Sequence, residues 1–130
     1  MSILKSLKLV LAGLGLVSVL MPGAVWARAS ASVDLQAAIS VGELPKQGLE
    51  TYKLIHQGGP FASERDGVVF GNRERLLPLN KRGYYREYTV PTPGLRHRGV
   101  KRIVCGGKPV TPEVCYYTAD HYASFRKIVP

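Results

Sequence analysis

The chain has 130 residues and a formal net charge of +9 at pH 7, and 45% of its residues are hydrophobic. This length accommodates one domain with a modest core and excludes an assembly of several large domains. The excess of positive charge favours an anionic partner, either nucleic acid or a membrane surface, although many soluble basic proteins have no such ligand.

Residues 1–27 have the features of a secretory signal peptide. Lys5 and Lys8 precede an uncharged apolar run, a Pro-Gly pair breaks the helix, and small or apolar residues follow at 25–27. The alternative is an uncleaved membrane anchor, because residues 9–27 carry no charge and approach the minimum spanning length. The helix breaker favours cleavage. We therefore expect a secreted domain at 28–130, periplasmic if the cell has an outer membrane, without stable membrane association.

The first element expected in this domain is a helix over about residues 45–57. Leu49, Tyr52 and Ile55 recur at helical spacing and should face the core, and a Gly-Gly-Pro sequence ends the pattern. The segment 33–39 before the helix fits either a strand or a helical turn.

After the helix, apolar and polar residues alternate with the period of a strand. Proline- and glycine-rich turns separate the strands. One helix followed by consecutive short strands predicts an α+β fold, with the helix packed on one face of a twisted antiparallel sheet. The expected strands are residues 68–70, 84–90, 100–105, 115–118 and 124–129.

The chain has two cysteines, Cys105 and Cys115, and turn-forming residues separate them. Export implies an oxidising compartment, so we expect a disulfide that joins the two strands of a hairpin. In the chain-entropy description, a disulfide that closes a loop of this length adds about 3 kcal/mol to the free energy of unfolding. No histidine pair accompanies the cysteines, and the three histidines are scattered, so neither a metal nor a cofactor is expected.

Four side chains are candidates for a catalytic centre. Alternation places Glu87 on one face of its strand, and Arg98 and Arg102 on one face of the next. If these strands pair, the three side chains share a surface. His121 falls in the turn between the last two strands, from which it can reach the same surface.

These residue types suit the cleavage of RNA through its own 2′-hydroxyl without a metal. A carboxylate accepts the 2′-hydroxyl proton, and a histidine protonates the departing 5′-oxygen. Two guanidinium groups stabilise the charge on the phosphorus. Taken singly, each residue also has a structural interpretation, since strand glutamates and arginines are often surface charges and a lone histidine is often a hydrogen-bonded turn residue.

Five ordered segments make the chain similar to the microbial guanyl-specific ribonucleases of the barnase superfamily, and most similar to their small secreted bacterial branch. The resemblance covers about residues 41–129. The segments are GPF at 59–61, DGVVFGNRE at 66–74, GYYREYTV at 83–90, TPGLRHR at 92–98 and YYTADHY at 116–122.

The resemblance implies a role for each candidate. Glu87 matches the general base, His121 the general acid, and Arg98 and Arg102 the phosphate-binding arginines. Glu74 would accept hydrogen bonds from guanine N1 and N2, and neighbouring backbone N–H groups would meet O6 and N7. The implied guanine-binding residues are Phe70, Gly71, Asn72, Arg73, Glu74 and Tyr122.

The chain departs from the family pattern in three places, one of which is Arg86, a positive charge beside Glu87 on the opposite sheet face. Gly71 stands where relatives often have glutamine, which matters only if that position acts through its side chain. Cys105 and Cys115 do not match the terminal disulfide of some relatives, so this bridge is inferred from the local sequence alone.

The resemblance implies a monomeric secreted endoribonuclease that cleaves single-stranded RNA after guanosine. Transphosphorylation gives a 2′,3′-cyclic phosphate, which is then hydrolysed to the 3′-phosphate, and a barstar-like acidic inhibitor is a further possible partner. The main alternative is a non-catalytic secreted RNA-binding protein with a basic groove and stacking tyrosines. A cationic membrane-active protein is less favoured, because the expected helix carries only Lys46 and Lys53 as basic residues besides its histidine.

Overall fold

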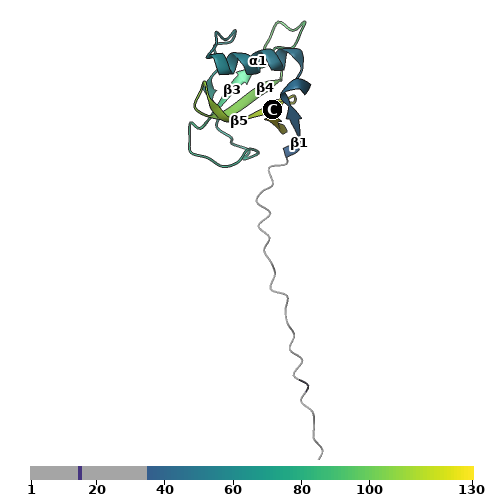
Figure 1. Cartoon of the computed structure of the whole chain (residues 1–130), viewed down its shortest axis with the longest axis vertical. Coiled ribbons are helices and arrows are strands. Elements are labelled where there is room, and N and C mark those ends of the chain that lie inside the picture. Colours follow the sequence, from purple (N-terminus) through teal and green to yellow (C-terminus); the bar gives the residue numbers. More distant parts are fainter. Residues whose placement is uncertain (1–14, 16–34) are drawn as a thin grey trace, which may run out of the picture.

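The computed structural model describes Gly15 and residues 35–130, and the expected signal peptide and its cleavage site lie outside these described residues. Figure 1 shows one helix lying across one face of a single sheet. The elements are β1 (Leu35–Ser40), the 3-10 turn η1 (Val41–Glu43), α1 (Lys46–Gln57), β2 (Val68–Val69), β3 (Tyr85–Thr89), β4 (Arg102–Gly107), β5 (Pro112–Thr118) and β6 (Phe125–Val129).

The sheet has six strands in the order β1-β6-β5-β4-β3-β2. Strands β2 to β6 pair antiparallel as expected, and the α+β class is confirmed. The sheet is mixed rather than wholly antiparallel, because β1 pairs with β6 in parallel. A parallel pair needs a long connection between its strands, and nearly the whole domain lies between these two. The sequence allowed either a strand or a helical turn at 33–39, and the structure shows a strand, β1, over residues 35–40. Arg126 anchors β1 by donating hydrogen bonds to the carbonyls of Ala37 and Ala38.

Helix α1 begins after Pro45, which suits the start of a helix because its fixed φ matches and it has no N–H to leave unpaired. It ends at Gly58, whose φ of 81° lies in the left-handed region that glycine adopts without steric cost. Ile55 is buried, whereas Leu49 and Tyr52 are half-buried and pack against the same core. The face of the helix predicted from spacing is therefore confirmed.

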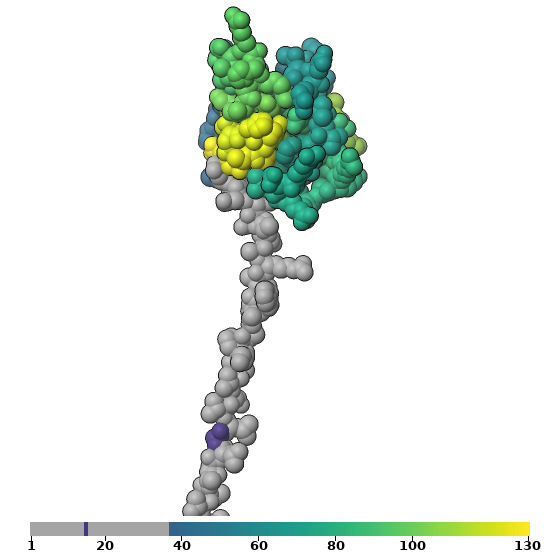
Figure 2. Space-filling model, turned by 180° about the vertical axis from the view of Figure 1, so that it is seen from behind, coloured from purple at the N-terminus to yellow at the C-terminus, as the bar shows by residue number. Residues whose placement is uncertain are grey.

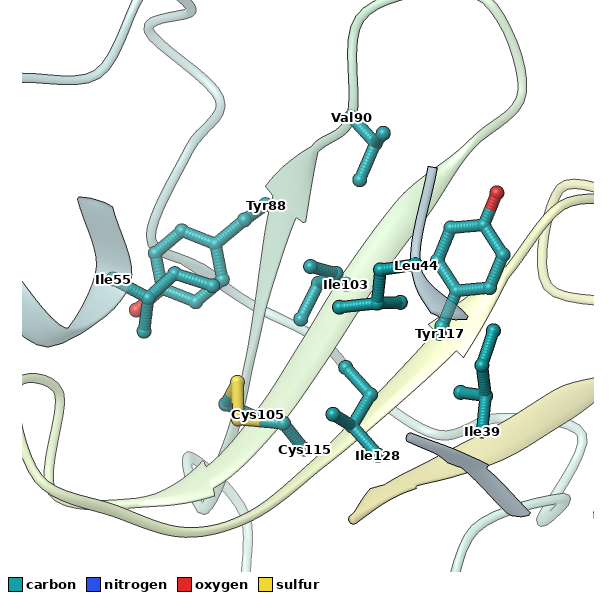
Figure 3. Packing of buried hydrophobic residues seen from close by; sticks show 10 residues of the cluster. All are labelled: Ile39, Leu44, Ile55, Tyr88, Val90, Ile103, Cys105, Cys115, Tyr117 and Ile128. Carbon is teal, nitrogen blue, oxygen red and sulfur yellow. A yellow bond between two sulfur atoms is a disulfide. The ribbon is translucent and has the colours of Figure 1, made fainter. Parts of the chain in front are cut away.

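The main core lies between α1 and the sheet. Figure 3 shows Ile55 of the helix against Tyr88 of β3, with Ile103 of β4 nearby. Cys105 and Cys115 face each other across the β4–β5 ladder and form the expected disulfide within this cluster. Because alternate residues of a strand point to opposite faces, their neighbours along the strands face away from the helix.

A second core covers the opposite face of the sheet. Its buried residues come mainly from the strands, but Leu77 comes from the long connection between β2 and β3 and is only 1% exposed. Burying this leucine fixes the connection against the sheet. The cluster consists of Leu77, Tyr85, Val104, Tyr116 and Phe125. Among the described residues, no helix is both long and apolar enough to cross a membrane.

Candidate active site

Glu87 lies in the middle of β3, on the face away from the helix, as alternation predicted. It is paired with Val104 of β4 and is only 9% exposed. Its Oε2 accepts a hydrogen bond of 2.8 Å from the hydroxyl of Tyr122, and its Oε1 lies 3.5 Å from Nη2 of Arg98. A buried carboxylate is costly unless it is paired, and these two neighbours supply the pairing.

Arg98 reaches Glu87 from a loop and not from a strand, so its expected place on β4 is wrong. The loop that follows β3 contains Pro91 and Pro93, which cannot donate to a strand ladder, and Gly99 at a φ of 63°. As a result β4 begins at Arg102 rather than at residue 100. The predicted approach of Arg98 to Glu87 is nevertheless observed.

Thr89 orients Arg98, and the sequence interpretation did not anticipate this role. The hydroxyl of Thr89 accepts a hydrogen bond of 2.9 Å from Nε of Arg98. Its backbone N–H donates to Asp66, and its carbonyl accepts from the hydroxyl of Thr51 on α1. Asp66 also accepts a hydrogen bond from the N–H of Ser63. The only signal in the sequence was the position of Thr89, two residues after Glu87 and therefore on the same strand face.

Arg102 is buried, with 3% exposure, beneath the loop that carries Arg98. Its Nη1 and Nη2 donate to the backbone carbonyls of Arg98, Gly99 and Lys101. Its Nε, like Nη2 of Arg98, has no hydrogen-bond partner among the described residues. The 3.5 Å approach of Arg98 to Glu87 is thus an ion pair without hydrogen-bond geometry, and both arginines retain a buried donor for an anion.

His121 and Tyr122 lie at the turn between β5 and β6, at φ values of 54° and 71°. Asp120 holds this turn by accepting hydrogen bonds from Thr118 and Ser124. Burial opposes ionisation of the Asp120 carboxyl, but these hydrogen bonds outweigh it and lower its pKa. His121 thus lies in the turn predicted from sequence. Its side chain is exposed there, and its backbone N–H donates to the carbonyl of Val100.

Tyr122 connects the candidate catalytic centre with the expected guanine site. Its ring stacks on Phe70, with ring centroids 5.1 Å apart and an interplanar angle of 28°. Burial raises the pKa of Tyr122, the hydrogen bond to Glu87 raises it further, and the positive charge of Arg102 acts in the opposite direction. The phenol therefore remains protonated at neutral pH and can donate to Glu87.

The segment 71–74 forms a tight loop after β2. The side-chain amide of Asn72 donates to the carbonyl of Leu77 and accepts from its N–H, so this side chain is occupied in holding the loop. Within the described part of the chain, the backbone N–H groups of Asn72, Arg73 and Glu74 make no hydrogen bond. The Glu74 carboxylate is exposed. The loop thus presents free donors and one free acceptor.

A hollow of about 520 Å³ brings most of the expected residues together. Glu87 and His121 line it, as do all six expected guanine-binding residues, whereas Arg102 and Arg98 do not. Arg98 lines a smaller hollow of about 280 Å³ beside the loop that follows β3. In Figure 2 the C-terminal segment lies between that loop, in green, and the teal segments that precede β3.

Neither of the remaining histidines lines the hollow of about 520 Å³, although His97 lines the smaller one beside Arg98. His56 Nδ1 is hydrogen-bonded to the carbonyl of Tyr52 on α1, and His97 Nδ1 accepts from the N–H of Gly99. Among residues 35–130, no three histidine, cysteine or carboxylate side chains come together as a metal site.

Comparison with known proteins gives a consistent result. A family model described as ribonuclease matches residues 27–129. The chain is 51% identical over 98 residues to guanyl-specific ribonuclease Sa3 of Kitasatospora aureofaciens, covering 75% of this chain and 67% of that protein. It is 48% identical over 95 residues to guanyl-specific ribonuclease Sa of the same organism, covering 73% of this chain and 96% of that protein.

Solved structures of ribonuclease Sa2 share the fold. One, determined with mononucleotides, is 45% identical, has a TM-score of 0.68, and covers 74% of this chain and 95% of its own. Another, determined with guanosine-2'-cyclophosphate, is 45% identical, has a TM-score of 0.66, and covers 73% of this chain and 98% of its own.

Proposed function

This chain belongs to the ribonuclease family, and we propose that it is a guanyl-specific endoribonuclease that cleaves single-stranded RNA by transphosphorylation. The observation that carries the proposal is the buried carboxylate of Glu87, which lines one hollow together with His121 and the loop 71–74. Binding of RNA alone requires neither a buried carboxylate nor a histidine beside a base-sized hollow.

In the first step Glu87 accepts the proton of the 2′-hydroxyl, and the 2′-oxygen attacks the adjacent phosphorus. The bond from phosphorus to the 5′-oxygen breaks, and His121 donates its proton to that oxygen. The product is a 2′,3′-cyclic phosphate. In the second step His121 accepts a proton from water, and the water oxygen attacks the phosphorus of the cyclic phosphate. The bond from phosphorus to the 2′-oxygen breaks, Glu87 returns its proton to that oxygen, and the product ends in a 3′-phosphate.

Arg98 and Arg102 stabilise the negative charge that develops on the phosphoryl oxygens. This assignment is supported by the buried, unpartnered donors at Nη2 of Arg98 and Nε of Arg102. Donors held in place before the reaction need no reorganisation when charge develops, which is the usual source of electrostatic catalysis. Thr89 and the carbonyls of the loop hold the two guanidinium groups in position.

Guanine binds against the loop 71–74. Glu74 accepts from N1 and N2 of the base, and the free backbone N–H groups donate to O6 and N7, while Phe70 and Tyr122 contact its face. Adenine has an acceptor at N1 and no amino group at position 2, so it leaves the carboxylate without donors, which is costly. If position 71 contacts the base through its backbone, no side chain is needed there. Gly71 can therefore fill this role.

The alternative of a non-catalytic RNA-binding protein is not favoured, since the family and the curated relatives are ribonucleases. The deciding experiment treats the domain with a defined RNA in EDTA and maps the cut ends. We expect cuts after guanosine that end in a cyclic phosphate, and no cutting of the matching all-deoxy strand. Loss of activity on removal of divalent metal, or efficient cleavage of DNA, would refute the mechanism.

We further expect the domain to be exported after cleavage near residue 27, and to act as a monomer. The basic surface and the exposed hollow also fit a barstar-like acidic inhibitor as a partner. Fractionation of the producing cells and mass determination of the mature N-terminus test the first expectation, and size-exclusion chromatography tests the second.

A further inference from the structure

A second hollow, of about 630 Å³, lies behind the loop that carries the expected guanine site. Residues 70–73 form a wall of both hollows, so the two are separated only by this loop. The opposite wall is the segment 80–83, which belongs to the same connection between β2 and β3, and Tyr85 of β3 contributes to the lining. Nothing in the proposed reaction uses this second hollow.

The charge of this hollow is entirely positive. Arg73, Lys81 and Arg82 line it and are exposed, and no acidic residue contributes to its lining. Within the described part of the chain, none of the three forms an ion pair with a carboxylate. Glu74 follows Arg73 in the sequence but lines the other hollow. Three unneutralised cations around one concave surface attract an anion more strongly than the same charges dispersed over a convex surface.

The walls are held by hydrogen bonds. Asn72 is bonded through both ends of its amide to the backbone of Leu77, and the hydroxyl of Tyr85 donates to the carbonyl of Pro78. The backbone carbonyl of Lys81 accepts from the N–H of Tyr84, which fixes the second wall to the start of β3. These hydrogen bonds hold the backbone of both walls, so only the ends of the long basic side chains need to adjust to a ligand.

We propose that this hollow binds a phosphate of the RNA strand outside the bond that is cleaved. The inference rests on the proposed function, and it implies that the enzyme binds an RNA substrate longer than a dinucleotide. Because residues 70–73 form a wall of both the guanine site and this hollow, a strand bound at the guanine site can place a neighbouring phosphate in this hollow. Arg73 and Arg82 supply planar donors that match a phosphate, and Lys81 supplies a flexible point charge.

The test compares the wild type with the double variant Lys81→Ala/Arg82→Ala. Arg73 is left intact because it belongs to the expected guanine loop. The matched control is Lys108→Ala/Lys127→Ala, which removes the same charge from two exposed residues that line neither this hollow nor the guanine site. The substrates are the dinucleotide GpU and oligonucleotides in which GpU is extended by several residues on the 5′ side or on the 3′ side.

For at least one extended substrate, we expect kcat/KM of the double variant to be lower by roughly threefold or more, mainly because KM rises. The slope of log kcat/KM against log salt concentration should become shallower by roughly 0.7 for each phosphate contact that is lost. Activity on GpU should remain within about twofold of the wild type, because this dinucleotide has no phosphate outside the cleaved bond that could occupy the hollow. The extension that shows the loss identifies the direction of the strand. Equal losses on GpU and on both extended substrates, or an equal loss in the control, would overturn the proposal.

Binding of a 2′-O-methyl oligonucleotide, which cannot be cleaved, separates this inference from the proposed function. If the wild type cleaves no RNA but the double variant alone loses affinity for this strand, the function is wrong and the subsite stands. If affinity is unchanged in the double variant, the subsite is wrong whatever the activity.

Discussion

The hydroxyl of Tyr122 donates a 2.8 Å hydrogen bond to Oε2 of Glu87, although 35 residues separate them in the sequence. The same ring stacks on Phe70, so one side chain contacts both the candidate base and the aromatic wall of the expected guanine site. A hydrogen bond from a neutral donor to a carboxylate orients the carboxylate and satisfies one of its lone pairs. Tyr122 is therefore a positioning residue for Glu87 as well as a candidate contact to the base.

Tyr122→Phe removes this hydrogen bond and keeps the ring. Hydrogen bonds to charged groups contribute about 1.5–3 kcal/mol, so we expect kcat to fall by about tenfold or more. The KM for a guanosine substrate should change less, because stacking on Phe70 is preserved. Steady-state kinetics on a dinucleotide measures both. Tyr117→Phe, in the core on the opposite face of the sheet, is the control for general effects of losing a phenol. An unchanged kcat would show that Glu87 needs no positioning by Tyr122.

Glu74→Ala should alter base selectivity more than the chemical step. Glu74 is exposed at the rim of the hollow and makes no contact with Glu87 or Arg98 in the hydrogen bonds and ion pairs of the described residues. We expect cleavage after guanosine to fall by about 10²-fold, and cleavage after adenosine to change little, because only guanine offers two donors to this carboxylate. Glu64→Ala removes an exposed acid outside the hollow and serves as the control. Equal losses for both bases would show that Glu74 does not contact the base.

The strand faces were predictable from sequence, because alternation alone decides which residues of a strand share a surface. Ile103 faces the helix and Glu87 faces away, as period two requires. The place of Arg98 was not predictable in this way, because it lies in a loop whose path depends on prolines and on Gly99 at positive φ. The contacts that hold the site, from Thr89 to Arg98 and from Tyr122 to Glu87, join segments that only the tertiary structure brings together.

Loss of the disulfide should weaken the fold without impairing the site. Cys105 and Cys115 belong to the core beneath α1, whereas Glu87 faces the other side of the sheet. The loop between them is short, and the chain-entropy description gives about 3 kcal/mol for its closure. We expect Cys105→Ser/Cys115→Ser to lower the free energy of unfolding by about this amount in urea titrations, and to keep near-normal kcat where the variant is folded. Wild-type protein reduced with dithiothreitol is the control. A loss of kcat in a fully folded variant would contradict the expectation that the disulfide does not affect the site.

The turn that presents His121 should become less stable in acid. The pKa of Asp120 is lowered in the folded protein, since its hydrogen bonds to Ser124 and Thr118 outweigh the cost of burial. A carboxyl whose pKa is lower in the folded than in the unfolded protein stabilises the fold at pH values above its unfolded pKa, here 3.8. This contribution is lost as the pH falls through the pKa of the folded protein. Asp120→Ala should thus be less stable than the wild type at pH 7, and the difference should shrink below pH 3.8. Urea midpoints at several pH values measure it, and a difference independent of pH would contradict the assignment.

Glu87→Ala and His121→Ala should separate the two halves of the reaction. Each general acid or base typically contributes about 10²–10⁴-fold. The glutamate must be ionised to accept the 2′-proton, and the histidine must be protonated to release the 5′-oxygen, so the wild-type rate should rise and then fall with pH. Glu87→Ala should abolish the acidic limb of this profile, and His121→Ala the alkaline limb.

A leaving group that needs no proton distinguishes the two roles directly. A nitrophenyl ester of guanosine 3′-phosphate releases nitrophenolate, which leaves as a stable anion without a proton, so this substrate should restore the rate of His121→Ala towards that of the wild type. It should not restore Glu87→Ala, in which the 2′-hydroxyl still lacks a base. Far-UV circular dichroism establishes that both variants are folded. Folded variants that keep near-normal rates and pH profiles would refute the assignment of base and acid, and the non-catalytic RNA-binding alternative would then account better for this chain.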